Sequence, residues 1–106
     1  MADALKIVGQ SNPVAATLTD LYTVPASTSF SGNLTIANRS TATSFRVSLA
    51  PAGAADALSQ YIAYDAAISA NQVIQLSGIA LATTDKIRVY ATLATLTFTV
   101  QGVEIT

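Results

Sequence analysis

The sequence predicts an all-β protein, an antiparallel β-sandwich with about seven to eight short strands in a single domain over residues 1–106. One observation is the alternation in residues 44–49, where Phe45, Val47 and Leu49 interleave with three polar side chains. Period two over this length is typical of a half-buried antiparallel strand. The second observation is that turn residues divide the chain at intervals of roughly ten residues, as in sandwiches and barrels.

The strands are expected in segments rich in β-branched and aromatic residues. These segments are residues 4–9, 18–24, 30–36, 44–49, 61–68, 73–81, 86–91 and 95–105. The segments between them contain Gly, Pro, Asn, Asp, Ser and Thr, which are typical of turns. We expect the first strand to lie at an edge of its sheet or in the sheet of a partner, because an uncovered edge is a template for pairing.

The first two strands are followed by prolines, and the third is interrupted by a glycine, residues that disturb a ladder of hydrogen bonds. Pro13 follows the first strand in a polar turn and restricts Asn12 to extended geometry. Pro25 ends the second strand, because proline has no backbone N–H to donate. In the third strand, Gly32-Asn33 predicts a bulge.

A polar break over residues 38–41 precedes the fourth strand, and the segment 51–53 (Pro-Ala-Gly) ends it. The alanine-rich residues 54–60 have helical propensity. Because an isolated helix of this length is marginal in water, we expect a loop with one helical turn.

The last strands follow the same pattern. Gly78 interrupts the sixth strand, and residues 83–85 form a turn before the regular alternation of residues 86–91. In the last strand, alternate apolar residues face the core, and Gly102 is expected to shift the register before Val103 and Ile105.

The composition points to a surface that is covered in use. Hydrophobic residues make up 51% of the chain, charged residues only 10%, and the net charge is −1, with a mean hydropathy of +0.47. Such a weakly charged and apolar surface resists aggregation poorly. We therefore expect another protein, or further copies of this chain, to cover much of the apolar excess.

Several classes of partner are excluded by the same pattern. No apolar run approaches the length that a bilayer requires, so no membrane partner is expected. Residues 1–6 contain neither a basic leader nor an apolar core, which predicts synthesis in the cytoplasm without secretion. Nucleic acid is not an expected partner, because binding it requires a concentrated basic face. The basic residues are instead dispersed: Lys6, Arg39, Arg46, Lys86 and Arg88.

The chemistry-bearing residues are few, because the chain has no His and no Cys. This excludes histidine-based triads, His- or Cys-ligated zinc and disulfides. Asp56 with Asp65, or Asp20 with Asp85, could form an acid/base pair, but single aspartates more often cap turns. The acidic residues are not clustered as in calcium loops, although a site between subunits stays open. We predict no enzyme, no catalytic residue, no metal site and no cofactor.

The remaining candidates are aromatic rings, glycines and asparagines. Tyr22, Tyr61, Tyr64 and Tyr90 could form a platform for sugars or single-stranded nucleic acid, although packing in the core or an interface is favoured. The glycines are isolated and form no phosphate-binding loop: Gly9, Gly32, Gly53, Gly78 and Gly102. The glycosylation patterns at Asn33 and Asn38 are interpreted as coincidences of a Thr/Ser-rich sequence.

Taken in order, six segments of the chain resemble a group of small structural proteins encoded by tailed bacteriophages, including cyanophages. The segments are Thr19–Ala26, Leu34–Arg39, Phe45–Gly53, Tyr61–Asp65, Asp85–Tyr90 and Gly102–Ile105. The similarity extends over nearly the whole chain. One departure is Ser27-Thr28, where related proteins often have Gly-Lys after Val-Pro-Ala.

The resemblance implies a β-sandwich or jelly-roll module of the virion. Several members of the group serve as cement or decoration proteins of the capsid, commonly as oligomers where capsomers meet. We therefore expect a virion protein that bridges capsid subunits, with the major capsid protein and further copies of itself as partners and a trimer as the favoured oligomer. The alternatives are a tail, baseplate or fibre module and a carbohydrate-binding domain. The termini and residues 51–60 are the expected interface.

Overall fold

The computed structural model describes residues 3–106; the first two residues of the segment read for a secretory leader lie outside this range. The described chain forms eight strands and two short 3-10 helices. The strands are β1 (Asp3–Ser11), β2 (Thr19–Thr23), β3 (Ser29–Asn38), β4 (Thr43–Ala50), β5 (Tyr61–Ile68), β6 (Val73–Leu81), β7 (Lys86–Ala91) and β8 (Leu96–Ile105). The 3-10 helices, η1 (Pro51–Gly53) and η2 (Leu58–Gln60), lie between β4 and β5.

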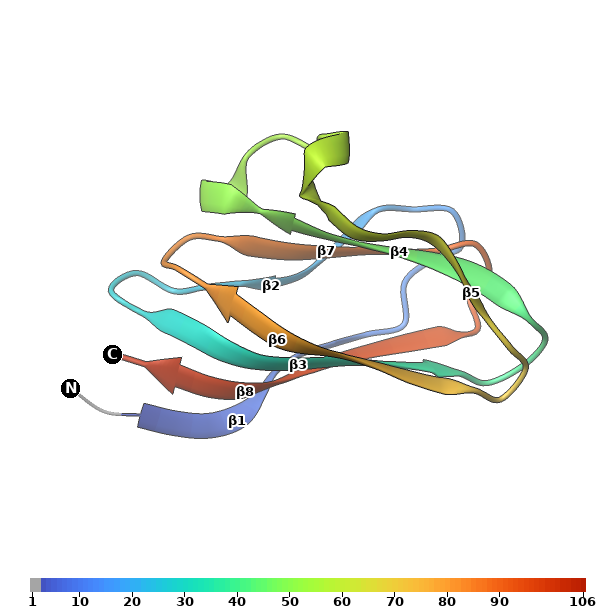
Figure 1. Cartoon of the computed structure of the whole chain (residues 1–106), viewed down its shortest axis with the longest axis horizontal. Coiled ribbons are helices and arrows are strands. Elements are labelled where there is room, and N and C mark those ends of the chain that lie inside the picture. The colour runs from blue at the N-terminus through green and yellow to red at the C-terminus, as the bar shows by residue number, and fades with distance from the viewer. Residues whose placement is uncertain (1–2) are drawn as a thin grey trace.

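The strands form two antiparallel sheets that face each other, with the orders β1-β8-β3-β6 and β2-β7-β4-β5 (Figure 1). Each strand of the first half pairs with one of the second half: β1 with β8, β2 with β7, β3 with β6 and β4 with β5. The chain thus follows the path of a long hairpin folded over on itself, which is the jelly roll. The predicted antiparallel sandwich of seven to eight strands is confirmed.

Side chains from both sheets fill the space between them. Phe45 of β4 and Phe98 of β8 meet edge to face, with ring centroids 6.3 Å apart. On β7, the three alternate apolar residues are fully buried, as the sequence pattern predicts. Burial of one such aliphatic or aromatic side chain contributes about 1.5–3 kcal/mol, so this layer is the main source of stability.

The bulge predicted in β3 at Gly32-Asn33 lies instead in the neighbouring strand, because β3 pairs with β8 without a shift while Ser77 and Gly78 of β6 both lie opposite Asn33. Gly78 has a φ of +77°, a backbone conformation that glycine adopts without strain. β6 therefore bends at Gly78 and continues to Leu81 as one strand. A bulge increases the local twist and makes an edge strand a poorer template for pairing.

The expectation that Gly102 shifts the register of the last strand is wrong. β8 keeps an unbroken register with β3 along their whole paired length, and the irregularity beside it lies in β1. Alternation therefore continues past Gly102, so that Glu104 is buried while Ile105 is 36% exposed. Val103 lies on the outer face with Ile105.

β3 and β8 approach each other closely where Gly32 is paired with Gly102. A Cβ atom on Gly102 would lie 2.2 Å from the Ser31 carbonyl oxygen, and one on Gly32 would lie 2.2 Å from the Gln101 carbonyl oxygen. Real Cβ atoms do not approach backbone oxygens to this distance. The two central strands of this sheet can therefore approach each other this closely only because both residues of the pair are glycine.

The segment from Pro51 to Gln60 is a loop with one turn of 3-10 helix at each end, in agreement with the predicted loop and helical turn. It folds back over the outer face of β4 and β7 (Figure 1). As a result Ser48 and Ala50, which lie on that outer face, have no exposed surface. Polar alternation alone predicts an exposed Ser48, and the loop explains the difference.

Candidate functional site

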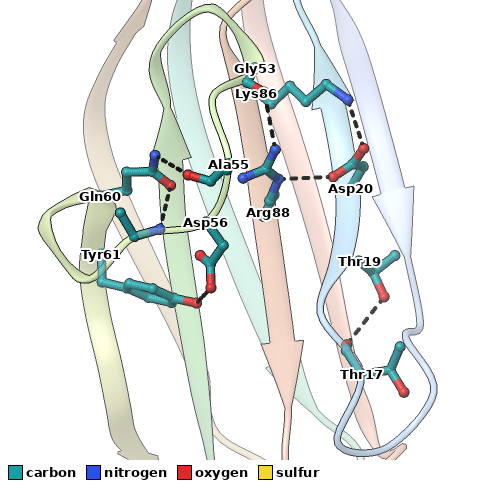
Figure 2. Close-up of polar contacts among 11 residues, drawn as sticks. Thr17, Thr19, Asp20, Gly53, Ala55, Asp56, Gln60, Tyr61, Lys86 and Arg88 are labelled. Carbon is teal, nitrogen blue, oxygen red and sulfur yellow. Dashed lines mark hydrogen bonds and ion pairs between the residues drawn. The ribbon is translucent and has the colours of Figure 1, made fainter.

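The carboxylates considered as acid/base pairs each have a separate structural partner. Asp20 of β2 accepts hydrogen bonds from the Lys86 ammonium (2.9 Å) and the Arg88 guanidinium (3.2 Å) of β7 (Figure 2). Asp85 accepts from the backbone N–H groups of Ala52 and Ala82, both at 2.8 Å, and so closes the turn before β7. Lys86, followed by Arg88, holds the pKa of the Asp20 carboxyl below its usual range.

Asp56 and Asp65 are likewise engaged. Asp56 accepts a hydrogen bond from the Tyr61 hydroxyl at 3.1 Å, and Asp65 forms two contacts with the Arg46 guanidinium, at 2.7 and 3.3 Å. Within residues 3–106, no group of three or more acidic side chains is placed to hold a metal ion. The same range contains no helix long and apolar enough to cross a membrane.

Asn38, in one of the two glycosylation patterns, is only 4% exposed. Its amide donates to the carbonyl oxygens of Thr41 (2.8 Å) and Ser69 (3.0 Å), and its oxygen accepts from the Ser40 backbone (3.1 Å). The side chain thus ties together the turns after β3 and β5, which explains why a buried asparagine is stable there.

A buried polar cluster joins the two sheets near the chain termini. The Tyr22 hydroxyl of β2 donates to the Glu104 carboxylate of β8, and the Lys6 ammonium of β1 lies 2.7 Å from the same carboxylate. Lys6, followed by Tyr22, lowers the pKa of the Glu104 carboxyl, whereas burial and then Glu104 raise the pKa of the Tyr22 hydroxyl. Tyr22 also packs edge-on against Phe30, so this tyrosine belongs to the core.

The other three tyrosines gather around one arginine on the outer face of the β2-β7-β4-β5 sheet. The Arg46 guanidinium carbon lies 4.2 Å from the ring centroid of Tyr64 and 4.6 Å from that of Tyr90. Tyr61 and Tyr64 meet at 84°, with centroids 5.1 Å apart. We call this group, with Asp65, the tyrosine–arginine cluster. Tyr64 is exposed, whereas Tyr61 and Tyr90 are half-buried, so of the four tyrosines only Tyr22 has the packing in the core that was one of the two favoured roles.

Two irregularities in β5 build the tyrosine–arginine cluster. Opposite Arg46, β5 has two residues, Tyr64 and Asp65, between the pairs that Phe45 and Val47 form. Both side chains therefore reach Arg46, one by its ring and the other by its carboxylate. Asp65 has a φ of +50°, which is unusual for a residue other than glycine.

The second irregularity inserts Ile62 between the residues paired with Val47 and Ser48. In a regular strand, Tyr61 and Tyr64 would lie on opposite faces, because side chains alternate. The insertion brings both rings to the outer face. Nothing in the sequence of β5 signals these bulges, since glycine is absent from it.

The loop before β5 holds Tyr61 from the other side. The Gln60 amide donates a hydrogen bond to the Ala55 carbonyl oxygen at 2.9 Å, and the Tyr61 hydroxyl donates one to the Asp56 carboxylate, as Figure 2 shows. Arg88 reaches the Gly53 carbonyl oxygen at 3.4 Å and so fastens the loop to β7. The loop between β4 and β5, which lies beside the tyrosine–arginine cluster, is therefore held to β5 and β7 by these hydrogen bonds.

A different surface lies at the β1 edge of the other sheet. Leu5 is 82% exposed and Ile7 is 55% exposed, and both are on the same side of β1. Their neighbours across the pairing with β8 are Val103 and Gln101, and Ile105 continues the strip. We call Leu5, Ile7, Val103 and Ile105 the β1 apolar strip.

An open hollow of about 330 Å³ adjoins the β1 apolar strip on the outer face of this sheet. Its lining consists of Leu5, Lys6, Ile7, Asn33, Gln101 and Gly102. The lining combines two exposed aliphatic side chains with two amides and with Lys6, whose side chain is 52% exposed.

The four sheet edges differ in their protection. β2 has only five residues and a register shift, β5 has two shifts, and β6 has one. β1 and β6 each have nine residues and one shift, but β1 pairs regularly over five residues, from Asp3 to Ile7, before its shift at Val8. Short length and bulges are the usual means of preventing edge-to-edge pairing, so the segment Asp3 to Ile7 is the longest regular run that any of the four edges offers.

A scan against protein-family models, a search of curated proteins and a search of solved structures found no match to this chain.

Proposed function

We propose that this protein is a structural component of a tailed-bacteriophage virion, a decoration or cement protein that associates with its own copies and bridges neighbouring subunits of the major capsid protein. The observation that carries the proposal is the β1 edge, which pairs regularly from Asp3 to Ile7, together with its apolar strip. The resemblance of six segments to small structural proteins of such phages supports it. The proposed location is the virion, after synthesis in the cytoplasm of the host.

The physical role follows from the two features of β1. A free edge offers backbone N–H and C=O groups to a strand of a neighbour, and the apolar strip adds buried area to that contact. Interfaces that hold bridging oligomers bury about 1,200–2,000 Å² in total, far more than one strand supplies. We therefore propose that the outer face beside β1 takes part together with the strand.

A trimer is the proposed oligomer, in which the β1 edge of each copy meets a different surface of the next. Contacts of this heterologous type close into a ring when the rotation between copies is suitable. Light scattering after size exclusion is expected to give three times the chain mass of 10.9 kDa. A monomer at every concentration would contradict self-association, whereas a dimer would correct only the number.

The double substitution Leu5→Glu with Ile7→Lys is expected to shift this oligomer to the monomer while the fold persists. It places charges in the β1 apolar strip without changing the net charge, and both positions are more than half exposed. Val14→Glu is the matched control, because Val14 is 71% exposed but lies outside the strands. Equal masses for the double variant and the parent would remove the β1 edge from the interface.

The location is tested by the copy number of the chain in purified source particles, measured by quantitative mass spectrometry against the major shell protein. A ratio comparable to that of the shell protein is expected for a decoration protein. A few copies per particle would favour the second candidate, a tail, baseplate or fibre module. Absence from particles would contradict both.

Shells without the protein are expected to be less resistant to heat and osmotic shock than complete shells.

A further inference from the structure

The tyrosine–arginine cluster is built at a cost to the strand that holds it. Asp65 adopts a left-handed backbone conformation, which costs a residue with a Cβ atom about 1–2 kcal/mol. The two bulges in β5 also give up regular pairing with β4. Bulges and strained residues concentrate where a side chain is re-aimed for binding. Here the re-aimed side chains are Tyr61, Tyr64 and Asp65.

The re-aimed side chains form a corner of aromatic surface with polar groups at its rim. Tyr61 and Tyr64 stand at 84° to each other, and the Tyr64 side chain is 51% exposed. Arg46 is held over the ring of Tyr64 by the bidentate contact with Asp65. The rings are therefore fixed before any ligand arrives, and little conformational entropy remains to be lost on binding.

The rim groups can exchange hydrogen bonds with hydroxyl groups. The carboxylates of Asp56 and Asp65 accept hydrogen bonds, and half of the Asp65 side chain is exposed. The Arg46 guanidinium donates, and its side chain remains 27% exposed. Hydrogen bonds to ionised groups are about twice as strong as neutral ones, which lets a few of them orient a small ligand.

This combination differs from the β1 apolar strip in the ligand that it fits. Protein interfaces extend over roughly 800 Å² on each partner, and their cores are depleted of aspartate. The tyrosine–arginine cluster is small, each of its side chains ends in a polar group, and two carboxylates flank its rings. A pyranose has the complementary form, since its C–H face packs on an aromatic ring while its hydroxyls lie at the periphery.

We propose that the tyrosine–arginine cluster is a saccharide-binding site for a mono- or disaccharide unit, which packs on Tyr64 and Tyr61 and pairs its hydroxyls with Asp65, Asp56 and Arg46. The site lies on the β2-β7-β4-β5 sheet, whereas β1 belongs to the other sheet, so a partner that binds at the β1 edge does not itself occupy the cluster. The inference stands on these residues alone and does not depend on the proposed place in a virion.

The test is a titration of ¹⁵N-labelled protein, followed by ¹H–¹⁵N correlation spectra. The probes are glucose, galactose, mannose, N-acetylglucosamine and disaccharides of each. At least one probe is expected to shift the backbone resonances of Arg46, Tyr61, Tyr64 and Asp65 in a saturable way. If no probe shifts them, or if the shifts lie elsewhere on the molecule, the saccharide site does not exist.

Variants distinguish a true site from weak surface contact. Tyr64→Ala is expected to raise the dissociation constant of the best probe about tenfold or more, because stacking on an aromatic ring is lost. Tyr64→Phe retains the ring and is expected to bind nearly as the parent does. Val73→Ala, at a side chain 63% exposed on β6 of the other sheet, is the matched control. Equal affinity of Tyr64→Ala and the parent would overturn the proposal.

A second variant protects the test against loss of folding. Arg46→Lys keeps the positive charge but loses the planar two-point contact with Asp65, so it is expected to weaken binding less than Tyr64→Ala does. Circular dichroism melting of each variant checks the fold. If Tyr64→Ala or Arg46→Lys instead abolishes binding of a shell protein while every sugar fails, the cluster is a protein interface and the saccharide proposal is wrong.

Discussion

Gly102→Ala is expected to lower the free energy of unfolding by about 3 kcal/mol or more, the upper range for forcing extra atoms into a packed interior. The added Cβ would lie 2.2 Å from the Ser31 carbonyl oxygen and 2.5 Å from the Cα of Gly32. β8 cannot move away, because it is held between β1 and β3. Since small domains have about 5–15 kcal/mol in total, urea unfolding followed by circular dichroism should detect a large shift of the midpoint.

Gly78→Ala is the matched control for this prediction. Gly78 has a φ of +77°, but no heavy atom lies within 4 Å of an added Cβ. Only backbone strain of about 1–2 kcal/mol is expected there. Equal midpoints for the two variants would mean that β3 and β8 separate easily at the Gly32–Gly102 pair, contrary to the close approach described above.

The sandwich could be predicted from the sequence because its signal is repeated in every strand. Alternation in residues 44–49 and 86–91 identifies the face that each strand buries, and the turn residues between strands limit their length. Register is strongly specified where one face is buried, since a slip of one residue would expose the whole apolar set. These strands accordingly have the predicted burial, apart from the covered Ser48.

The end of β8 was predicted incorrectly for a local reason. Val103 and Ile105 are apolar and Glu104 is charged, so the pattern favours a shift at Gly102 that buries the apolar pair. The structure instead buries Glu104, because Tyr22 and Lys6 supply a donor and a cation from other strands. No local pattern contains that information, since 82 residues separate Glu104 from Tyr22.

The tyrosine–arginine cluster could not be predicted for a similar reason. Its contacts join β4, β5 and β7, and they depend on bulges that the sequence of β5 does not mark. The sequence did identify the tyrosines as amphipathic side chains that need a surface or an interface. It could not separate Tyr22, which is buried between the sheets, from the three tyrosines on the outer face, because all four occupy strands of similar composition.

Glu104→Leu is expected to lower the free energy of unfolding by about 1–3 kcal/mol, because the buried Tyr22 hydroxyl loses its acceptor. Replacing both groups is expected to recover part of the loss, so the double variant Glu104→Leu with Tyr22→Phe should be more stable than Glu104→Leu alone.

Lys6→Met tests the ion pair with Glu104, the third residue of the buried polar cluster being Lys6. Its side chain is 52% exposed, and a loss within about 1 kcal/mol is expected. Urea unfolding of the four proteins measures these differences, and an undiminished loss in the double variant would contradict the pairing.

The same carboxylate makes stability depend on pH. The folded chain lowers the pKa of Glu104, first through Lys6 and then through Tyr22, so the stabilisation is fully present above the ordinary pKa of 4.5 and is lost as pH falls through the lower folded value. Asp20 behaves in the same direction because of Lys86 and Arg88. Unfolding midpoints between neutral pH and pH 3 should therefore fall for the parent and fall less for Glu104→Gln, with Asp20→Asn removing a separate share. A parallel decline in Glu104→Gln and the parent would mean that the ionised Glu104 carboxylate, with its contacts to Lys6 and Tyr22, does not stabilise the folded chain.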